Sequence, residues 1–121
     1  VGLGTDIGGG TSFSMLQTLN EAYKFLQMRG DTLSILKMFY LATLGGAETL
    51  DLSDKIGNFE IGKEADFIVL DKTCTPLIKM RLEKCSDILE ELFVLGILGD
   101  DRAVKQTWSV GQKVHDRDQV N

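Results

Sequence analysis

The sequence predicts an α/β fold in which a strand, a glycine loop and two helices precede a smaller strand-rich region with one added helix. Three observations support this class. A short apolar segment ends in glycines, apolar residues then recur at helical spacing, and turn signals separate short apolar runs in the second half. With 121 residues, 43% of them hydrophobic, the chain can form one domain with a modest core.

The first two elements are expected to be a strand and a helix. Residues 1–6 are predicted to form a short buried strand, because they are mostly apolar and end at a run of glycines. A helix is expected from about Ser14 to Met28, since Ser14 and Gln17 have capping-box spacing. Gly30 is placed to end this helix.

A second helix is expected to begin after a cap at Asp31 or Thr32. Apolar residues occur on nearly all of its faces, so it should be buried on most sides. Gly45 and Gly46 are expected to interrupt it before one further turn at residues 47–50.

The region after Leu52 is expected to be rich in strands. Residues 67–70 form an apolar run typical of a short buried strand. Residues 103–110 and 112–115 are interpreted as two strands on either side of a turn at Gly111.

Three remaining segments complete the secondary-structure prediction. Residues 74–84 fit neither a helix nor a strand pattern clearly. Ser86 is placed to cap a third helix, which should end near Gly96 or Gly99. Residues 116–121 are polar and are expected to form a flexible tail.

Charge and composition exclude several classes of partner. The net charge is −5 with acids and bases interspersed, which argues against a nucleic-acid surface and an anionic membrane surface. No apolar run approaches the roughly 20 residues of a membrane span. Cys74 and Cys85 lie outside any CxxC or Cys/His cluster, which favours free thiols in a reducing cytoplasm over a zinc knuckle.

The chain opens on Val1 within an apparent strand, so we expect it to be a piece of a longer protein.

The segment GTDIGGGT (4–11) presents one acid among glycines. It nearly fits a phosphate-binding P-loop, but Gly10 stands where the lysine is required and Asp6 would repel phosphates. Two interpretations of Asp6 stay open on the residues alone. It caps the loop or the next helix, or it is a carboxylate at the end of a strand that faces a metal ion or substrate.

Three stretches resemble the amidohydrolase superfamily, and among its members the guanine deaminase family. They are ATLGGAETLDLSDKIGNFEIGKEADFIVLD (42–71), GTDIGGGTSFSMLQTLNEAYK (4–24) and LEELFVLGILGDDRAVKQTWSVGQKV (89–114). The resemblance implies the last strand and helices of a TIM-type (β/α)₈ barrel, followed by part of a small β-sandwich domain with an added helix. A complete barrel needs about 250 residues, more than this chain supplies.

The resemblance also implies domain boundaries. Residues 1–50 would be the C-terminal part of the barrel, with strand eight and the helices after it. Residues 51–115 would be the later part of the sandwich, with an inserted helix at 86–98, and residues 116–121 the flexible tail.

By the same resemblance, Asp6 is the strand-eight aspartate, which binds a single catalytic zinc and accepts a proton from the attacking water. The implied reaction converts guanine and water to xanthine and ammonia, in a cytoplasmic homodimer. The histidine ligands of the family are missing, and His115, the only histidine, is interpreted as a surface or turn residue. The chain alone is therefore expected to be inactive.

Two alternatives to this function stay open. The chain could belong to another amidohydrolase that acts on a purine, pyrimidine or triazine ring, or it could be a non-enzymatic fragment that self-associates. The adjacent acids Asp100 and Asp101 are interpreted as a solvated turn. Ser12 and Ser14 are not part of a Ser-His-Asp motif.

Overall fold

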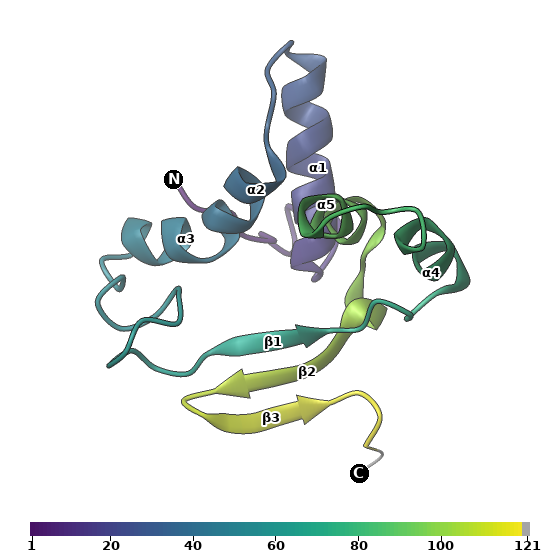
Figure 1. Cartoon of the computed structure of the whole chain (residues 1–121). Coiled ribbons are helices and arrows are strands. Elements are labelled where there is room, and N and C mark those ends of the chain that lie inside the picture. Colours follow the sequence, from purple (N-terminus) through teal and green to yellow (C-terminus); the bar gives the residue numbers. More distant parts are fainter. Residues whose placement is uncertain (120–121) are drawn as a thin grey trace.

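The structure, a computed structural model, describes residues 1–119 and combines a group of helices with a three-stranded antiparallel sheet of order β1-β2-β3. In Figure 1 the helices lie on one side of the sheet. This confirms the α/β class. In chain order the elements are α1 (Met15–Met28), α2 (Ile35–Ala42), α3 (Leu44–Thr49), β1 (Phe67–Leu70), α4 (Pro76–Leu82), α5 (Ile88–Leu98), the 3₁₀ turn η1 (Asp101–Ala103), β2 (Val104–Ser109) and β3 (Gln112–Asp116).

Helix α1 begins and ends where the sequence predicts. The Ser14 hydroxyl accepts a hydrogen bond from a backbone N–H of the first turn. At the other end, the Gly30 N–H donates to the carbonyl of Gln27 and the Asp31 N–H donates to that of Leu26. Gly30 has a φ of 81°, so this pair of bonds is a Schellman motif with glycine at its usual position.

The start of α2 was predicted wrongly. Its cap is Ser34, whose hydroxyl accepts from the backbone N–H of Lys37, rather than Asp31 or Thr32. The N–H of Asp31 donates to the carbonyl of Leu26, so Asp31 still belongs to the end of α1, and α2 begins only after Ser34.

The predicted break at Gly45 and Gly46 is also displaced. The break falls at Thr43, with φ −128° and ψ −103°, and both glycines lie inside α3. Gly45 is buried, and a Cβ at that position would lie 2.8 Å from the ring of Tyr40. Close packing against Tyr40, rather than interruption of a helix, therefore explains this glycine.

Burial of α2 on most sides is not observed in the described chain. Met38 is its one buried residue, and Leu36 is 59% exposed. The core forms where α1, α2 and the chain before β2 meet, through Leu16, Leu19, Leu33, Met38 and Ala103.

Residues 1–6 do not form the predicted strand, and Val1 is 94% exposed. A strand requires a neighbouring strand to complete its hydrogen bonds. The segment makes one backbone hydrogen bond to a distant residue, from the Leu3 N–H to the carbonyl of Leu41. An isolated bridge between Ile7 and Gly10 follows.

The predicted strands of the second half are confirmed. β1 pairs with β2 and β2 with β3, both antiparallel. Val110 and Gly111 connect β2 to β3 with φ values of 50° and 73°, and positive φ at both positions is typical of a type I′ hairpin. Across β1 and β2, the rings of Phe67 and Trp108 stack at 5.4 Å.

The unassigned segment 74–84 contains α4, which Thr75 caps and Pro76 begins. Helix α5 is capped by Asp87, not by the predicted Ser86, whose N–H and hydroxyl both donate to Glu90 instead. The helix ends at Gly99, one of the two predicted ends.

Candidate functional site

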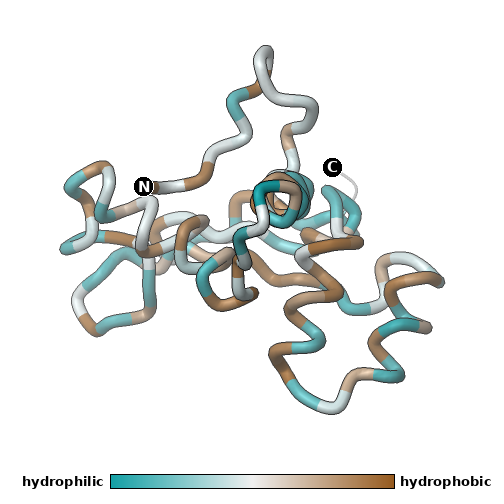
Figure 2. Tube along the Cα trace, turned by 90° about the horizontal axis from the view of Figure 1, so that it is seen from above, coloured by the Kyte–Doolittle hydropathy of each residue, from teal (hydrophilic) through white to brown (hydrophobic). Residues whose placement is uncertain are grey.

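The segment that carries Asp6 is fixed to the helices by the residues before it. Leu3 packs against the core cluster and donates its N–H to Leu41 in α2. Gly2 lies so close to α3 that a Cβ there would be 2.8 Å from the Cα of Gly46. After these anchors the chain projects from the rest of the molecule as a loop before it enters α1 (Figure 2).

Asp6 begins a tight turn. Its carbonyl oxygen accepts hydrogen bonds from the N–H groups of both Gly9 and Gly10. Asp6 itself has a φ of 45° and Gly8 a φ of 112°, so two residues of this short segment have left-handed backbone. Glycine adopts that conformation readily, whereas for Asp6 it is strained, and strain of this kind is concentrated at functional sites.

The carboxylate of Asp6 is exposed, and no hydrogen bond or ion pair between residues 1–119 involves it. Carboxylate oxygens are hard ligands suited to a divalent metal ion. No group of three or more His, Cys, Asp or Glu in the described part of the chain could hold a metal. Among the described residues, Asp6 is therefore an exposed carboxylate that is not part of any such group.

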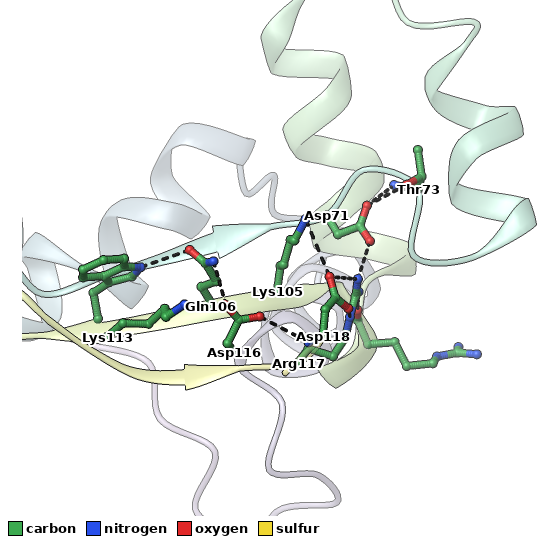
Figure 3. A network of polar contacts seen from close by, with 10 residues as sticks. Asp71, Thr73, Lys105, Gln106, Lys113, Asp116, Arg117 and Asp118 are labelled. Carbon is green, nitrogen blue, oxygen red and sulfur yellow. Dashed lines mark hydrogen bonds and ion pairs between the residues drawn. The ribbon is translucent and has the colours of Figure 1, made fainter. Parts of the chain in front are cut away.

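A second polar cluster, missed by the sequence reasoning, ties the end of β3 to the end of β1 (Figure 3). The guanidinium of Arg117 donates to the carbonyl of Arg102 at 2.6 Å, to the carboxylate of Asp71 at 2.8 Å and to Asp118 at 2.9 Å. We call the first two contacts the Arg117 latch. Arg117 lies within the segment expected to be a flexible tail, of which Val120 and Asn121 fall outside the described residues. The latch joins residues 46 positions apart, so local patterns carry no signal for it.

Hydrogen bonding also sets the electrostatics of the latch. Bonds from the backbone N–H and the hydroxyl of Thr73, followed by the bond from Arg117, lower the pKa of Asp71 to about 2. These donors stabilise the charged carboxylate more than burial penalises it. The latch is therefore fully ionised at neutral pH.

The other residues singled out in the sequence lie apart from Asp6. His115 is exposed on β3 opposite Thr107, as predicted for a surface residue. Asp100 caps η1 and pairs with Arg102, which lowers the pKa of Asp100. The two cysteines are free thiols.

Within the described residues, the surface groove between α4 and α5 is not an alternative metal-binding site. It does not include Asp6, and its lining mixes apolar residues with the charged Arg81, Lys84, Asp87 and Glu90.

Among the described residues, no helix has the length and hydropathy needed to cross a membrane.

A family model and a curated relative both match nearly the whole chain. Residues 1–114 match the model of the amidohydrolase family. The chain is 56% identical to a guanine deaminase of Escherichia coli over 117 residues, which is 97% of this chain and 27% of that protein. The chain thus spans about 27% of the length of this relative.

Solved structures agree with the sequence match. The Escherichia coli guanine deaminase superposes with a TM-score of 0.94 at 55% identity, covering 98% of this chain and 28% of that one. A guanine deaminase from Bradyrhizobium japonicum gives a TM-score of 0.83 at 34% identity, covering 96% and 31%.

Proposed function

Because the chain belongs to the amidohydrolase family, we propose that it is the C-terminal segment of a zinc-dependent guanine deaminase, which converts guanine and water to xanthine and ammonia. One observation carries this proposal: the fold and sequence of nearly the whole chain match the guanine deaminase of Escherichia coli, with a TM-score of 0.94 and 55% identity. An adenosine deaminase from Xanthomonas campestris is more distant, at 26% identity and a TM-score of 0.64. This difference favours guanine over adenosine as the substrate.

Within the full protein, residues 1–50 would complete a (β/α)₈ barrel and residues 51–115 would form part of a β-sandwich. Two features support this division. The hydrogen-bonding groups of residues 1–6 are mostly unused, as expected for a barrel strand whose neighbours lie elsewhere in the protein. The sheet carries the stacked rings of Phe67 and Trp108, with Phe59 80% exposed beside them, an aromatic surface suited to pack against a second sheet.

Asp6 would supply the part of the active site that this segment contributes. Placed at the end of the last barrel strand, its carboxylate would help to hold the metal and would accept a proton from the attacking water. Zinc, when bound, supplies a Lewis acid that lowers the pKa of water towards ~7. The solved adenosine deaminase named above contains bound zinc, which supports the choice of metal.

Guanine is the proposed substrate and a second copy of the full protein the proposed partner. A guanine deaminase from C. acetobutylicum has guanine bound in its active site and shares 28% identity and a TM-score of 0.73 with this chain. The two free thiols suit a reducing cytoplasm. The homodimer rests on the family resemblance.

The proposal is tested by following guanine-to-xanthine conversion by ultraviolet absorbance. The longest chain that the gene encodes and this 121-residue chain are compared side by side, both supplied with zinc. Turnover by the long form alone is expected, since one ligand cannot hold a catalytic metal. If the zinc-loaded long form does not convert guanine, the protein acts on a different substrate of the amidohydrolase family. If the short chain converts guanine, the proposal that the active site lies mostly outside this chain is wrong.

A further inference from the structure

We propose that Gly9 is a positioning residue for Asp6, because the missing side chain of Gly9 leaves the space that the Asp6 carboxylate occupies. This inference rests on the function proposed for Asp6. Gly9 has no side chain with which to bind a ligand, so its effect would come only through the Asp6 carboxylate.

The space around Gly9 is filled by Asp6. A Cβ built on Gly9 would lie 2.9 Å from Oδ2 of Asp6, whereas ordinary contact begins at 3.4 Å. The carboxylate would have to move by the difference, about 0.5 Å. Catalytic groups must be held to within about 0.5 Å of the productive geometry, so this displacement is large enough to affect a metal ligand.

The same contact predicts that the fold survives the substitution. The atom nearest to the new Cβ is the far end of a flexible side chain, and the next contacts, at 3.6 Å and 3.7 Å, are ordinary. The backbone of Gly9 lies outside the left-handed region, so alanine can adopt its conformation. The change therefore moves the carboxylate and leaves the turn in place.

The neighbouring glycines have different roles, which makes them useful controls. A Cβ on Gly10 would lie 1.9 Å from the carbonyl oxygen of Thr5, so Gly10 is needed for the path of the backbone. Gly8 has open space around it but a φ of 112°. Lys24, an exposed residue of α1, serves as the control outside this loop.

The experiment compares Gly9→Ala, Lys24→Ala, Gly10→Ala and Asp6→Ala in the longest chain that the gene encodes. Three properties are measured for each: thermal unfolding by circular dichroism, the rate of zinc loss to a chelator together with the absorption spectrum of the cobalt-substituted protein, and kcat for guanine. For Gly9→Ala we expect an unchanged melting temperature, an altered cobalt spectrum, faster zinc loss, and a kcat reduced about tenfold to a hundredfold. Lys24→Ala should match the wild type in all three, and Gly10→Ala should lower the melting temperature.

The outcomes separate this inference from the proposed function. Wild-type zinc loss, spectrum and kcat in Gly9→Ala, with an inactive Asp6→Ala, would overturn the role of Gly9 alone. A melting temperature as low as that of Gly10→Ala would overturn it too, since Gly9 would then be required for the fold. Normal zinc retention and turnover in Asp6→Ala would overturn the function proposed for Asp6 itself.

Discussion

Removal of the Asp71 carboxylate should loosen the end of the sheet by a measurable amount. Asp71 accepts hydrogen bonds from the backbone and hydroxyl of Thr73 and from the guanidinium of Arg117. In Asp71→Ala these donors lose their acceptor, and Arg117 keeps its bond to the carbonyl of Arg102. The effect should be concentrated in residues 99–119, which the Arg117 latch connects to β1.

The magnitude follows from the charge interaction at Asp71. A pKa lowered from an ordinary 3.8 to about 2 corresponds to at most about 2.5 kcal/mol in favour of the charged carboxylate. The side chain of Asp71 is 18% exposed and that of Arg117 is 31% exposed, so solvent screening reduces this value. The two bonds from Thr73 are the larger causes of the lowered pKa and act within the turn after β1, so only the part that comes from Arg117 holds residues 99–119. For that part we expect a loss of up to about 1 kcal/mol, which makes local opening of these residues up to about 5 times more frequent.

The pH dependence of this loss has a defined sign. The pKa of Asp71 is lower in the folded chain than in the unfolded chain, so the contribution is fully present above 3.8 and is lost as the pH falls towards about 2. The difference between wild type and Asp71→Ala should therefore be the same at pH 7 and pH 5, and smaller at pH 3.

Hydrogen exchange measured by mass spectrometry on peptides from residues 99–119 tests these values, with rates normalised to those of unfolded peptides at each pH. Lys72→Ala is the matched control, because it removes an ion pair to Glu91 in which Lys72 is 55% exposed. This pair contributes about 0–1 kcal/mol and involves none of residues 99–119, so exchange of those residues should stay close to that of the wild type. Equal protection in wild type and Asp71→Ala at pH 7 would show that the Arg117 latch does not stabilise residues 99–119. A difference as large at pH 3 as at pH 7 would show that the stabilisation does not depend on the ionised carboxylate of Asp71.

The remaining predictions concern the carboxylate, the core and the exposed surface. Asp6→Ala in the full protein should reduce guanine turnover at least about 10²-fold with an unchanged circular dichroism spectrum, and normal turnover would contradict its catalytic role. Met38→Ala should lower the free energy of unfolding by about 2–5 kcal/mol because Met38 is fully buried, whereas Lys24→Ala on an exposed face of α1 should change it by less than about 0.5 kcal/mol; urea unfolding measures both. The isolated 121-residue chain should self-associate, since it exposes large apolar groups such as Phe13 at 80% and Met28 at 87%. Light scattering that shows a monodisperse monomer at high concentration would refute this last prediction.

The sequence predicted those features that short-range chemistry determines. Ser14 and Gly30 delimit α1 because a cap and a left-handed residue act within a few positions of the helix end. The turn at Gly111 was predictable because glycine readily adopts the left-handed backbone that this turn requires. Where two caps competed, the prediction failed: Ser86 and Asp87 both suit a helix start, and Ser86 is engaged by Glu90 instead.

Features that depend on distant partners could not be predicted in this way. The segment 1–6 has the composition of a strand, but the described chain supplies no neighbouring strand, so its apolar pattern does not produce one. The residues alone left Asp6 either a cap or a carboxylate at a strand end, and only the family resemblance indicated it as a metal ligand. The reason that Gly9 lacks a side chain became apparent only from the position of the Asp6 carboxylate in three dimensions.

The two polar features of the chain should act independently of each other. The Asp6 turn is held by contacts within residues 2–10 and to Leu41, whereas the Arg117 latch joins β1, η1 and the end of β3, and no hydrogen bond connects the two among the described residues. Substitutions at sites without shared partners usually add within about 0.5 kcal/mol. In the double variant Gly9→Ala/Asp71→Ala, zinc loss should therefore match that of Gly9→Ala and exchange of residues 99–119 should match that of Asp71→Ala. Faster zinc loss in Asp71→Ala alone would show that the sheet end helps to position Asp6, through a path that the described contacts do not contain.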